Sequence, residues 1–246
     1  MKFDAKSLKY LAGRVFSNGL KITISKPEAT VLDRFELLER LISNKKIIHL
    51  GCCDHVSLIK EKVKAGVWLH SRLCKKAARC VGLDIDKEGI DYLKNQMNYS
   101  DVICADLMLD KLPEIRKNKW DYIVLGEVLE HVSNPSMFLK NINEKYKKNI
   151  GAIIITVPNA FSWLNTIYAF RHKEFINTDH RYWFTPYTLA KVLTNAGFKV
   201  DDFYFCEPFQ PRGFMASKVN IKNALMIFIL KKFPALRRTL IVVARL

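Results

Sequence analysis

Two aspartates stand at the ends of apolar runs that have the character of buried β-strands. Asp84 closes the run in VGLDID, and Asp106 follows the run in ICADLM. Ligands of open α/β sheets bind beyond the carboxyl ends of the strands. A carboxylate there can accept hydrogen bonds from ribose hydroxyls or from an adenine amino group. Either aspartate alone could be a helix cap or a solvated charge, but the pair indicates a nucleoside-binding edge.

Neighbouring residues could contact the same ligand. Ile85 follows Asp84, and Leu107 offers a backbone N–H and an apolar side chain beside Asp106. The preceding apolar run ends in the turn IIHLGCCDH, where Gly51 would let the backbone approach a ligand closely. An ordinary tight turn can look the same, so this turn carries weight only together with the aspartates.

The segment GEVLEHVSNP, residues 126–135, directly follows the fourth apolar run. The backbone carbonyls of Leu125 and Gly126 could accept hydrogen bonds from the ammonium group of an amino acid ligand. Glu127, Glu130 and His131 would lie at the mouth of the sheet. His131 is a candidate general base because imidazole titrates near neutral pH. The alternative is a structural imidazole that packs the following helix.

A second candidate base is His180, in NTDHRYWF. Asp179 beside it could fix the tautomer of the imidazole. The alternative is a loop histidine that is hydrogen-bonded to the backbone. We identify no group of residues with metal-ligand spacing and expect no metal site.

The elements that would position these residues alternate between strand-like and helix-like segments, which predicts a parallel sheet covered by helices. Helical spacing or caps predict helices over residues 68–78 and 87–97, after Asn134 with Pro135, and after Thr185 with Pro186. Residues 32–42 also look helical. Strands are expected at residues 46–51, 80–85, 101–105, 120–125, 151–157, 199–205 and 239–245.

An aromatic segment follows the fifth predicted strand, and we expect residues 160–187 to form a lid over an acceptor. Flat aromatic faces suit a sugar ring or an aromatic molecule, although some of these side chains must pack on the core. The nine aromatics are Phe161, Trp163, Tyr168, Phe170, Phe175, Tyr182, Trp183, Phe184 and Tyr187.

The ordered combination of these motifs resembles the class I S-adenosylmethionine (SAM)-dependent methyltransferases. The resemblance covers residues 47–159, with a weaker echo at residues 180–198. GEVLEHVSNPSMFLKN followed by IIITVPNAF is similar to the small-molecule and saccharide branch. The family implies an α/β, Rossmann-like sheet of seven strands with helices on both faces. Six of its strands are parallel, and the last, here TLIVVARL, is antiparallel.

The resemblance also implies a cofactor, SAM, and roles for single residues. The methionine part of SAM would contact the turn residues Gly51, Cys52, Cys53 and Asp54, and the same end would be lined by Leu125, Gly126 and Glu127. The ribose would be held by Asp84 with Ile85, and the adenine by Asp106 with Leu107. The sequence departs from the family pattern in the turn. His49 stands where the family has an acid, and Cys53 and His55 stand where it has glycines.

Methyl transfer from a sulfonium mainly requires alignment, and a hydroxyl acceptor also needs a base. The family branch implies O-methylation of a saccharide or glycan precursor. The alternatives are a quinone-like lipophilic small molecule or RNA as acceptor, and a non-catalytic SAM-fold scaffold.

Composition limits the partners. The formal net charge is +16, and from Glu207 onward one acid faces eight bases. The segment 220–238 would form a basic helix that packs on the sheet, with peripheral membrane contact as the other interpretation. We do not expect nucleic acid as a partner, because we identify no appended RNA-binding module.

The expected organisation is an N-terminal helical segment, residues 1–45, on the substrate side, followed by the methyltransferase domain, residues 46–246. The first residues lack the apolar core of a secretory signal, and the six cysteines form no CxxC pair, so we expect a cytoplasmic protein with reduced thiols. The cysteines are Cys52, Cys53, Cys74, Cys80, Cys104 and Cys206.

Overall fold

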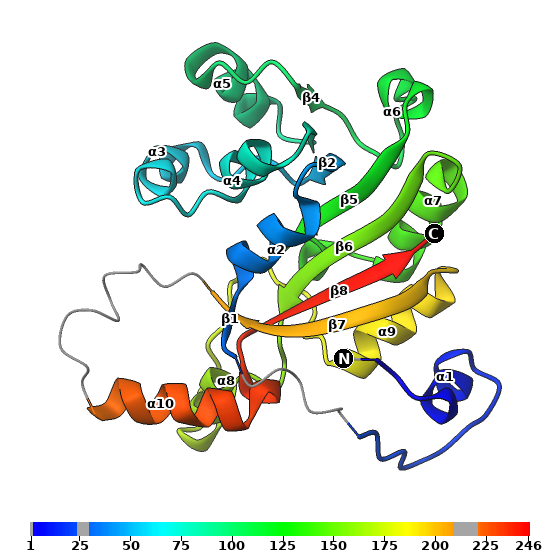
Figure 1. Cartoon of the computed structure of the whole chain (residues 1–246), viewed down its shortest axis with the longest axis vertical. Helices are drawn as coiled ribbons and strands as arrows, with labels where there is room; N and C mark the ends of the chain where they lie inside the picture. The colour runs from blue at the N-terminus through cyan, green and yellow to red at the C-terminus, as the bar shows by residue number, and fades with distance from the viewer. Residues whose placement is uncertain (1, 24–29, 209–220) are drawn as a thin grey trace.

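A computed structural model describes residues 2–23, 30–208 and 221–246 of the chain. Its centre is an eight-stranded sheet with the order β1-β7-β8-β6-β5-β2-β3-β4 (Figure 1). The strands are β1 (Leu32–Asp33), β2 (Lys46–Leu50), β3 (Arg79–Asp84), β4 (Val102–Cys104), β5 (Trp120–Gly126), β6 (Ile150–Pro158), β7 (Lys199–Glu207) and β8 (Thr239–Arg245). All seven predicted strands are present, each within one or two residues of its predicted bounds.

The α-helices within the described ranges connect these strands. They are α1 (Ala5–Leu11), α2 (Arg34–Ile42), α3 (Val56–Lys64), α4 (Leu69–Lys76), α5 (Lys87–Met97), α6 (Pro113–Lys117), α7 (Pro135–Tyr146), α8 (Trp163–Phe170), α9 (Pro186–Asn195) and α10 (Ile221–Lys232).

The directions of the strands confirm the predicted class of fold. β8 pairs antiparallel with both β6 and β7, whereas the other neighbouring strands are parallel. The eighth strand is the two-residue β1, which pairs with β7 inside a segment predicted to be helical. Asp33 is the reason that the helix starts late, because its side chain accepts hydrogen bonds from the N–H groups of Phe35 and Glu36.

Helices cover both faces of the sheet, as predicted. On one face α7 and α9 contribute Leu139, Ile142, Leu189 and Leu193 to the main core, and α1 lies against α9. On the other face α2 and α4 pack on the strands. Side chains alternate between the two faces along β2, so Ile48 enters the first core and Ile47 the second.

Local capping explains where two of the helices begin. The Asn134 side chain accepts from the N–H of Met137 at 3.1 Å, and Pro135 occupies the first turn of α7. Thr185 and Thr188 form a reciprocal capping box at the start of α9. Both starts agree with the prediction.

The C-terminal helix differs from the prediction of a basic helix over residues 220–238. Residue 220 lies outside the described residues, and α10 ends at Lys232, shortly before Pro234. Arg237 is fully buried and donates hydrogen bonds to the carbonyls of Leu230 and Phe205. It therefore braces the fold and does not belong to a solvated basic face.

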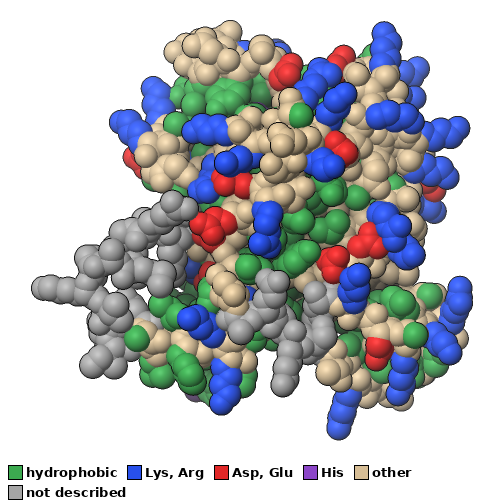
Figure 2. Space-filling view, viewed as in Figure 1, with side chains coloured by type: hydrophobic (Ala, Val, Ile, Leu, Met, Phe, Trp, Pro, Cys, Tyr) green, Lys and Arg blue, Asp and Glu red, His purple; other side chains and the backbone are tan. Residues whose placement is uncertain are grey.

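Lysine and arginine side chains cover much of the visible surface, with acidic side chains between them (Figure 2). This distribution agrees with the net charge of +16. In the described parts of the chain, no helix is both long and apolar enough to cross a membrane.

Candidate functional site

The turn after β2 depends on Gly51. This residue has φ +76°, and a Cβ at this position would lie 2.5 Å from Cγ2 of Val128. The N–H groups of Gly51 and Cys52 both donate to the carbonyl of Leu83, at 2.8 and 3.2 Å. The turn is thus folded tightly over the end of β3, and only glycine fits its first position.

Asp84 ties this turn to the end of β3. One carboxylate oxygen accepts from the N–H of Cys53 at 2.8 Å, and the other accepts from the N–H of Asp86 at 3.1 Å. Each oxygen has two lone pairs, so the side chain can still accept from ribose hydroxyls. The next side chain, Ile85, is 75% exposed and lies open to a ligand.

Asp106 stabilises the turn that follows β4. Its carboxylate accepts from the N–H of Met108 at 2.7 Å, and its own N–H donates to Asp110. Leu107 is only 2% exposed, so its side chain belongs to the core and does not offer the apolar contact predicted for it. The apolar side chain that projects from this turn is Leu109, which is 81% exposed.

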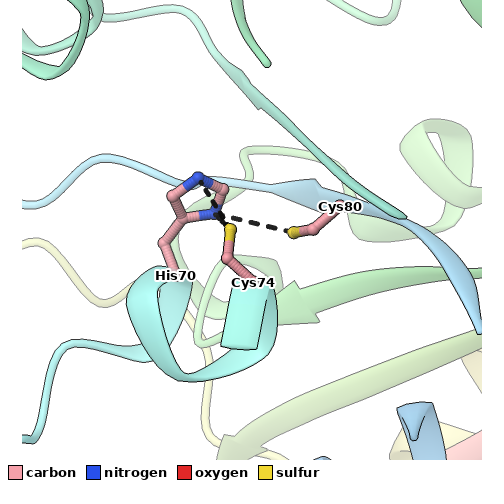
Figure 3. A group of neighbouring side chains, drawn as sticks. All are labelled: His70, Cys74 and Cys80. Carbon is pink, nitrogen blue, oxygen red and sulfur yellow. Dashed lines mark hydrogen bonds between the residues drawn. The ribbon is translucent and has the colours of Figure 1, made fainter. Parts of the chain in front are cut away.

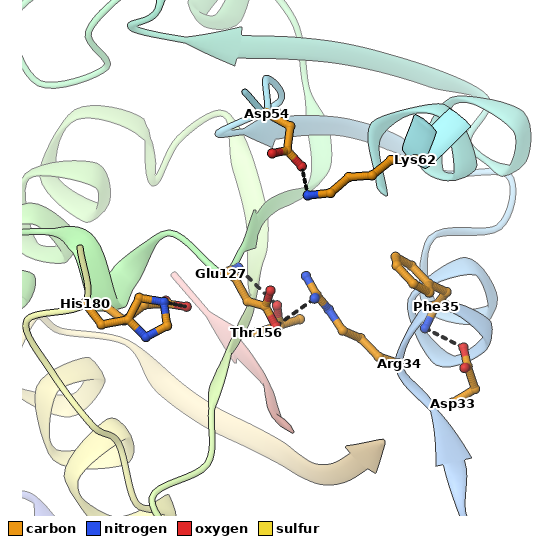
Figure 4. A network of polar contacts seen from close by, with 9 residues as sticks. Asp33, Arg34, Phe35, Asp54, Lys62, Glu127, Thr156 and His180 are labelled. Atoms are coloured by element: carbon orange, nitrogen blue, oxygen red, sulfur yellow. Dashed lines mark hydrogen bonds and ion pairs between the residues drawn. The ribbon is translucent and has the colours of Figure 1, made fainter. Parts of the chain in front are cut away.

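Two other residues of the predicted cofactor site already have partners. Asp54 forms an ion pair with Lys62 of α3 (Figure 4). His49 is buried on the face that packs against α4, and its Nδ1 lies 3.1 Å from Nδ1 of His70. His49 thus occupies the sequence position of the family's acid, but its side chain is buried inside the fold.

Glu127 follows β5 and is held in an unusual conformation. Its φ is +60°, a region that non-glycine residues seldom occupy. Its N–H donates to the backbone and side-chain oxygens of Thr156, at 3.0 and 3.1 Å. Its carboxylate pairs with Arg34 at 2.7 Å (Figure 4). Strain of this kind is concentrated at functional sites.

Sequence reasoning missed Arg34. This residue begins α2 and is only 8% exposed, yet it reaches across the sheet edge to Glu127. A basic residue near the start of a helix has no special signature in the sequence. Its importance becomes visible only when the N-terminal segment is placed beside β5.

The two candidate bases come together with Glu130. The rings of His131 and His180 are perpendicular, with centroids 4.7 Å apart. Nε2 of His180 lies 4.0 Å from Oε1 of Glu130, and the N–H of Arg181 donates to the carbonyl of Glu130. The three residues come from two segments about 50 residues apart, so the pairing was not visible in the sequence.

The electrostatics of this group are unusual. Glu130 is fully buried, and neither carboxylate oxygen has a hydrogen-bond partner within the described ranges. Burial raises the pKa of Glu130 to about 8, so the carboxyl is largely protonated at neutral pH. Burial, and then the neighbouring charge of His131, lowers the pKa of His180, so its imidazole is neutral at pH 7. The group can therefore exchange protons with a ligand.

Ligand atoms of Glu130, His131 and His180 all lie within 4.8 Å of one another. Carboxylate and imidazole groups at such distances can also hold a divalent cation. The expectation of no metal site remains a prediction.

The segment predicted to be a lid contains α8 and the loop after it. No residue of α8 is buried, and Phe170 and Phe175 are 82% and 57% exposed. Phe184, in contrast, is buried in the core. The loop is fastened to the site, because Tyr182 donates to the carbonyl of Ser133 at 2.7 Å.

Comparison with known proteins decides the family. The model of a family described as a methyltransferase domain matches residues 28–202, which is more than half of the chain. This chain belongs to the methyltransferase-domain family. The family match places the chain in the class I SAM-dependent methyltransferase superfamily, whose cofactor is SAM.

A curated relative is similar over part of the chain. It is the ubiquinone biosynthesis O-methyltransferase of Pelagibacter ubique (strain HTCC1062), which is 26% identical over 126 residues. The match covers 49% of this chain and 45% of that protein. The chain therefore spans about half the length of this relative.

Solved structures agree on the fold. A SAM-dependent methyltransferase from Archaeoglobus fulgidus has a TM-score of 0.50 at 17% identity, over 86% of this chain and 94% of that one. Magnesium protoporphyrin IX methyltransferase from Synechocystis PCC 6803, with bound SAH, has a TM-score of 0.51 at 12% identity, over 98% of this chain and 94% of that one. The small RNA methyltransferase HEN1 has a TM-score of 0.53 at 16% identity, over 94% of this chain and 27% of that one. Two of these names refer to very different molecules, magnesium protoporphyrin IX and small RNA, so the fold alone does not identify the acceptor.

The assignment of SAM gives the site geometry a chemical meaning, although the individual contacts remain predictions. Asp84 and Asp106 lie at the ends of adjacent parallel strands, and Glu127 lies across the same edge. The exposed side chains of Ile85 and Leu109 follow the same two strand ends and would cover an adenine. The turn at Gly51 would then face the methionine end of the cofactor.

Proposed function

We propose that the methyltransferase transfers a methyl group from SAM to a hydroxyl of a small lipophilic molecule. The observation that supports this most strongly is the group formed by Glu130, His131 and His180 beside the predicted cofactor edge. A hydroxyl loses its proton when it is methylated, so an O-methyltransferase needs a neutral base near the acceptor.

His180 is the proposed base. Its Nδ1 is buried and has no hydrogen-bond partner in the described parts of the chain, and its lowered pKa keeps the ring neutral. The acceptor oxygen forms a bond to the methyl carbon while the bond from that carbon to the SAM sulfur breaks. The hydroxyl proton passes to His180, and S-adenosylhomocysteine leaves. The protonated carboxyl of Glu130, together with the perpendicular ring of His131, would orient the His180 ring.

The proposal of a lipophilic acceptor is supported by the curated relative and by exposed apolar residues near the predicted lid. The relative is named for ubiquinone biosynthesis. Exposed apolar side chains lie on or next to α8, in the loop after it, and on or next to α10, namely Phe161, Phe170, Phe175, Ile176, Leu225, Phe228 and Phe233. We propose that this apolar surface, with Lys231 and Lys232 beside it, lets the enzyme take its acceptor from an anionic membrane surface.

A saccharide acceptor is the second candidate. It is supported by the aromatic side chains of residues 160–187, whose flat faces also suit sugar rings. None of the relatives named above carries a saccharide in its name, whereas one is named for a quinone pathway. We therefore place the quinone-like acceptor first.

The test is methyl transfer from labelled SAM to a matched panel of acceptors. The panel contains a catechol with an isoprenoid tail, a sugar nucleotide with free hydroxyls, and a short RNA. We expect product only from the catechol, identified by its mass. Product from the sugar alone would favour the second candidate, and no product from any acceptor, despite SAM binding, would favour a scaffold.

The base is tested with His180→Ala and His131→Ala in the same assay. Loss of the true base should lower turnover about 10²–10⁴-fold. SAM affinity should stay nearly unchanged, which serves as the control for folding. Parallel assays with and without added Mg²⁺, in chelator-treated buffer, separate proton transfer from a cation-dependent role of the same residues.

A further inference from the structure

A second group of ligating side chains lies on the face of the sheet that packs against α4, away from the cofactor edge. His70 and Cys74 are one turn apart on α4, and Cys80 is the second residue of β3 (Figure 3). One ring nitrogen of His70 and the two sulfurs all lie within 4.8 Å of one another. Positions i and i+4 of a helix share a face, so the helix presents both donors toward Cys80.

From this convergence we infer that His70, Cys74 and Cys80 bind a soft transition-metal ion, Zn²⁺ in the reducing conditions of a cell. Thiolate and imidazole ligands select zinc over magnesium or calcium. A zinc ion with Zn–S of about 2.3 Å and Zn–N of about 2.0–2.1 Å holds its ligand atoms roughly 3.3–3.8 Å apart. Nε2 of His70 is already 3.6 Å from Sγ of Cys74.

The surroundings of His70 match those of a metal ligand. Its Nδ1 lies 3.1 Å from Nδ1 of His49, so one of the two rings donates to the other. When His70 is the donor, its Nε2 lone pair is left for the metal. Sγ of Cys80 lies 4.0 Å from Nδ1 of His70, so this thiolate must turn toward Nε2 to share the ion. A second hydrogen-bonding partner of this kind fixes the tautomer and the orientation of most metal-bound histidines. His49 is then a positioning residue for the site.

The sheet leaves space for this ring. Gly82 lies opposite His49 in the β2–β3 register, and a Cβ at Gly82 would lie 2.9 Å from Cε1 of His70. A larger residue would push His70 away from Cys80. The absence of a side chain at this position of β3 therefore allows the three donors to converge.

The site also has an entrance. A cavity of about 310 Å³ is lined by His70, Cys74 and Cys80, with Tyr99 and Asp101 at the loop between α5 and β4. His70 itself is 1% exposed, so the donors lie at the inner wall of this cavity. An ion could enter from solvent, and a water molecule could complete a tetrahedral set of ligands.

The experiment uses the full-length protein, reduced with a phosphine and freed of metal by chelation. Co²⁺ is the spectroscopic probe, because cobalt bound by thiolates in a tetrahedral site absorbs strongly by charge transfer. We expect this absorption to saturate at one equivalent and to be displaced by Zn²⁺. Zinc at a hundredfold excess over Kd should raise the thermal midpoint by about 5–10 °C.

Variants locate the site. Cys74→Ser and Cys80→Ser should each abolish the cobalt–thiolate absorption, whereas Cys206→Ser, which removes a buried thiol on the same face of the sheet, should keep it. Cys74 is only partly buried, so Cys74→Ser remains informative if the variant at Cys80 does not fold. Circular dichroism verifies folding.

Two results would overturn the inference. One is a wild-type protein that shows no thiolate absorption with Co²⁺, which needs no variant to interpret. The other is absorption that persists in both cysteine variants, which would place the metal at Cys52 and Cys53 beside the cofactor edge. Saturation with SAM further distinguishes the two places. Zinc held by His70, Cys74 and Cys80 should be retained, because this site lies away from the cofactor edge.

Discussion

Asp84 joins the turn after β2 to the end of β3, and we expect it to accept hydrogen bonds from the SAM ribose. Asp84→Ala would remove this acceptor and also release the N–H of Cys53. Hydrogen bonds to a charged group contribute roughly 1.5–3 kcal/mol, so SAM affinity should fall about ten- to a hundredfold. Isothermal titration calorimetry with SAM measures this directly.

The matched control for Asp84 is Asp91→Ala, an exposed aspartate on the following helix, α5. Its affinity for SAM should equal that of the wild type. An Asp84→Ala protein that is folded and binds SAM with unchanged affinity would show that Asp84 only fastens the turn.

Glu130 should make stability depend on pH in a direction that a surface carboxylate would not. Its pKa is raised by burial from 4.5 to about 8. Between these values the unfolded chain has lost a proton that the folded chain keeps. The contribution of Glu130 to stability is thus fully present below about pH 4.5 and is lost as pH rises to about 8.

Replacement with glutamine isolates this effect. Glu130→Gln should gain stability relative to the wild type as pH rises from 5 to 8, by at most about 1.4 kcal/mol per pH unit. The lowered pKa of His180 has the opposite effect below pH 6.5, but it acts in both proteins and largely cancels in the difference. Urea unfolding at several pH values gives the comparison, and a difference independent of pH would mean that Glu130 is ionised in the folded protein.

An ion pair connects the helix α2 to the site, between Arg34 at its first residue and Glu127 after β5. Arg34→Met would keep the apolar stem of the side chain and remove its charge. Because the Glu127 side chain is 39% exposed, water can solvate it, and we expect a loss of only about 1–2 kcal/mol in unfolding free energy. SAM affinity should also fall, since Glu127 would lose its fixed position.

Arg40→Ala, at an exposed position of the same helix, is the control. It should change stability by less than about 0.5 kcal/mol and leave SAM binding unaltered. Equal behaviour of the two variants in both measurements would mean that the ion pair does not position Glu127.

Net charge and exposed apolar residues act together over the whole molecule. With a charge of +16, the protein should be attracted to anionic vesicles, and Leu225 and Phe228 on α10 could then enter the interface. We expect cosedimentation with anionic vesicles that weakens with added salt, and a clear loss of binding in the double variant Leu225→Glu, Phe228→Glu.

A control substitution separates the contribution of the apolar residues of α10 to vesicle binding from the effect of net charge. Leu58→Glu changes an exposed leucine on α3, far along the chain from α10. It alters the net charge in the same direction, yet it should reduce vesicle binding only slightly. A similar loss in both variants would show that attraction is purely electrostatic and that α10 does not dock.

The sequence by itself determined the sheet and the places where its strands end. Strands that are covered on both faces are apolar almost throughout, and the run IIITV correctly predicted β6. The family pattern predicted an antiparallel last strand, and β8 is antiparallel. Parallel strands end at one edge, which explains why acids at two strand ends predicted a nucleoside site before the strands were assembled.

Only the tertiary structure decided which side chains share an environment. Burial of Glu130, the approach of His180 to it, and the reach of Arg34 all depend on contacts between segments distant in sequence. The burial of Arg237, which donates to the carbonyl of Phe205 on β7, likewise follows from packing. Local spacing cannot reveal such contacts, because the free energy that selects them arises from burial and pairing across the assembled sheet.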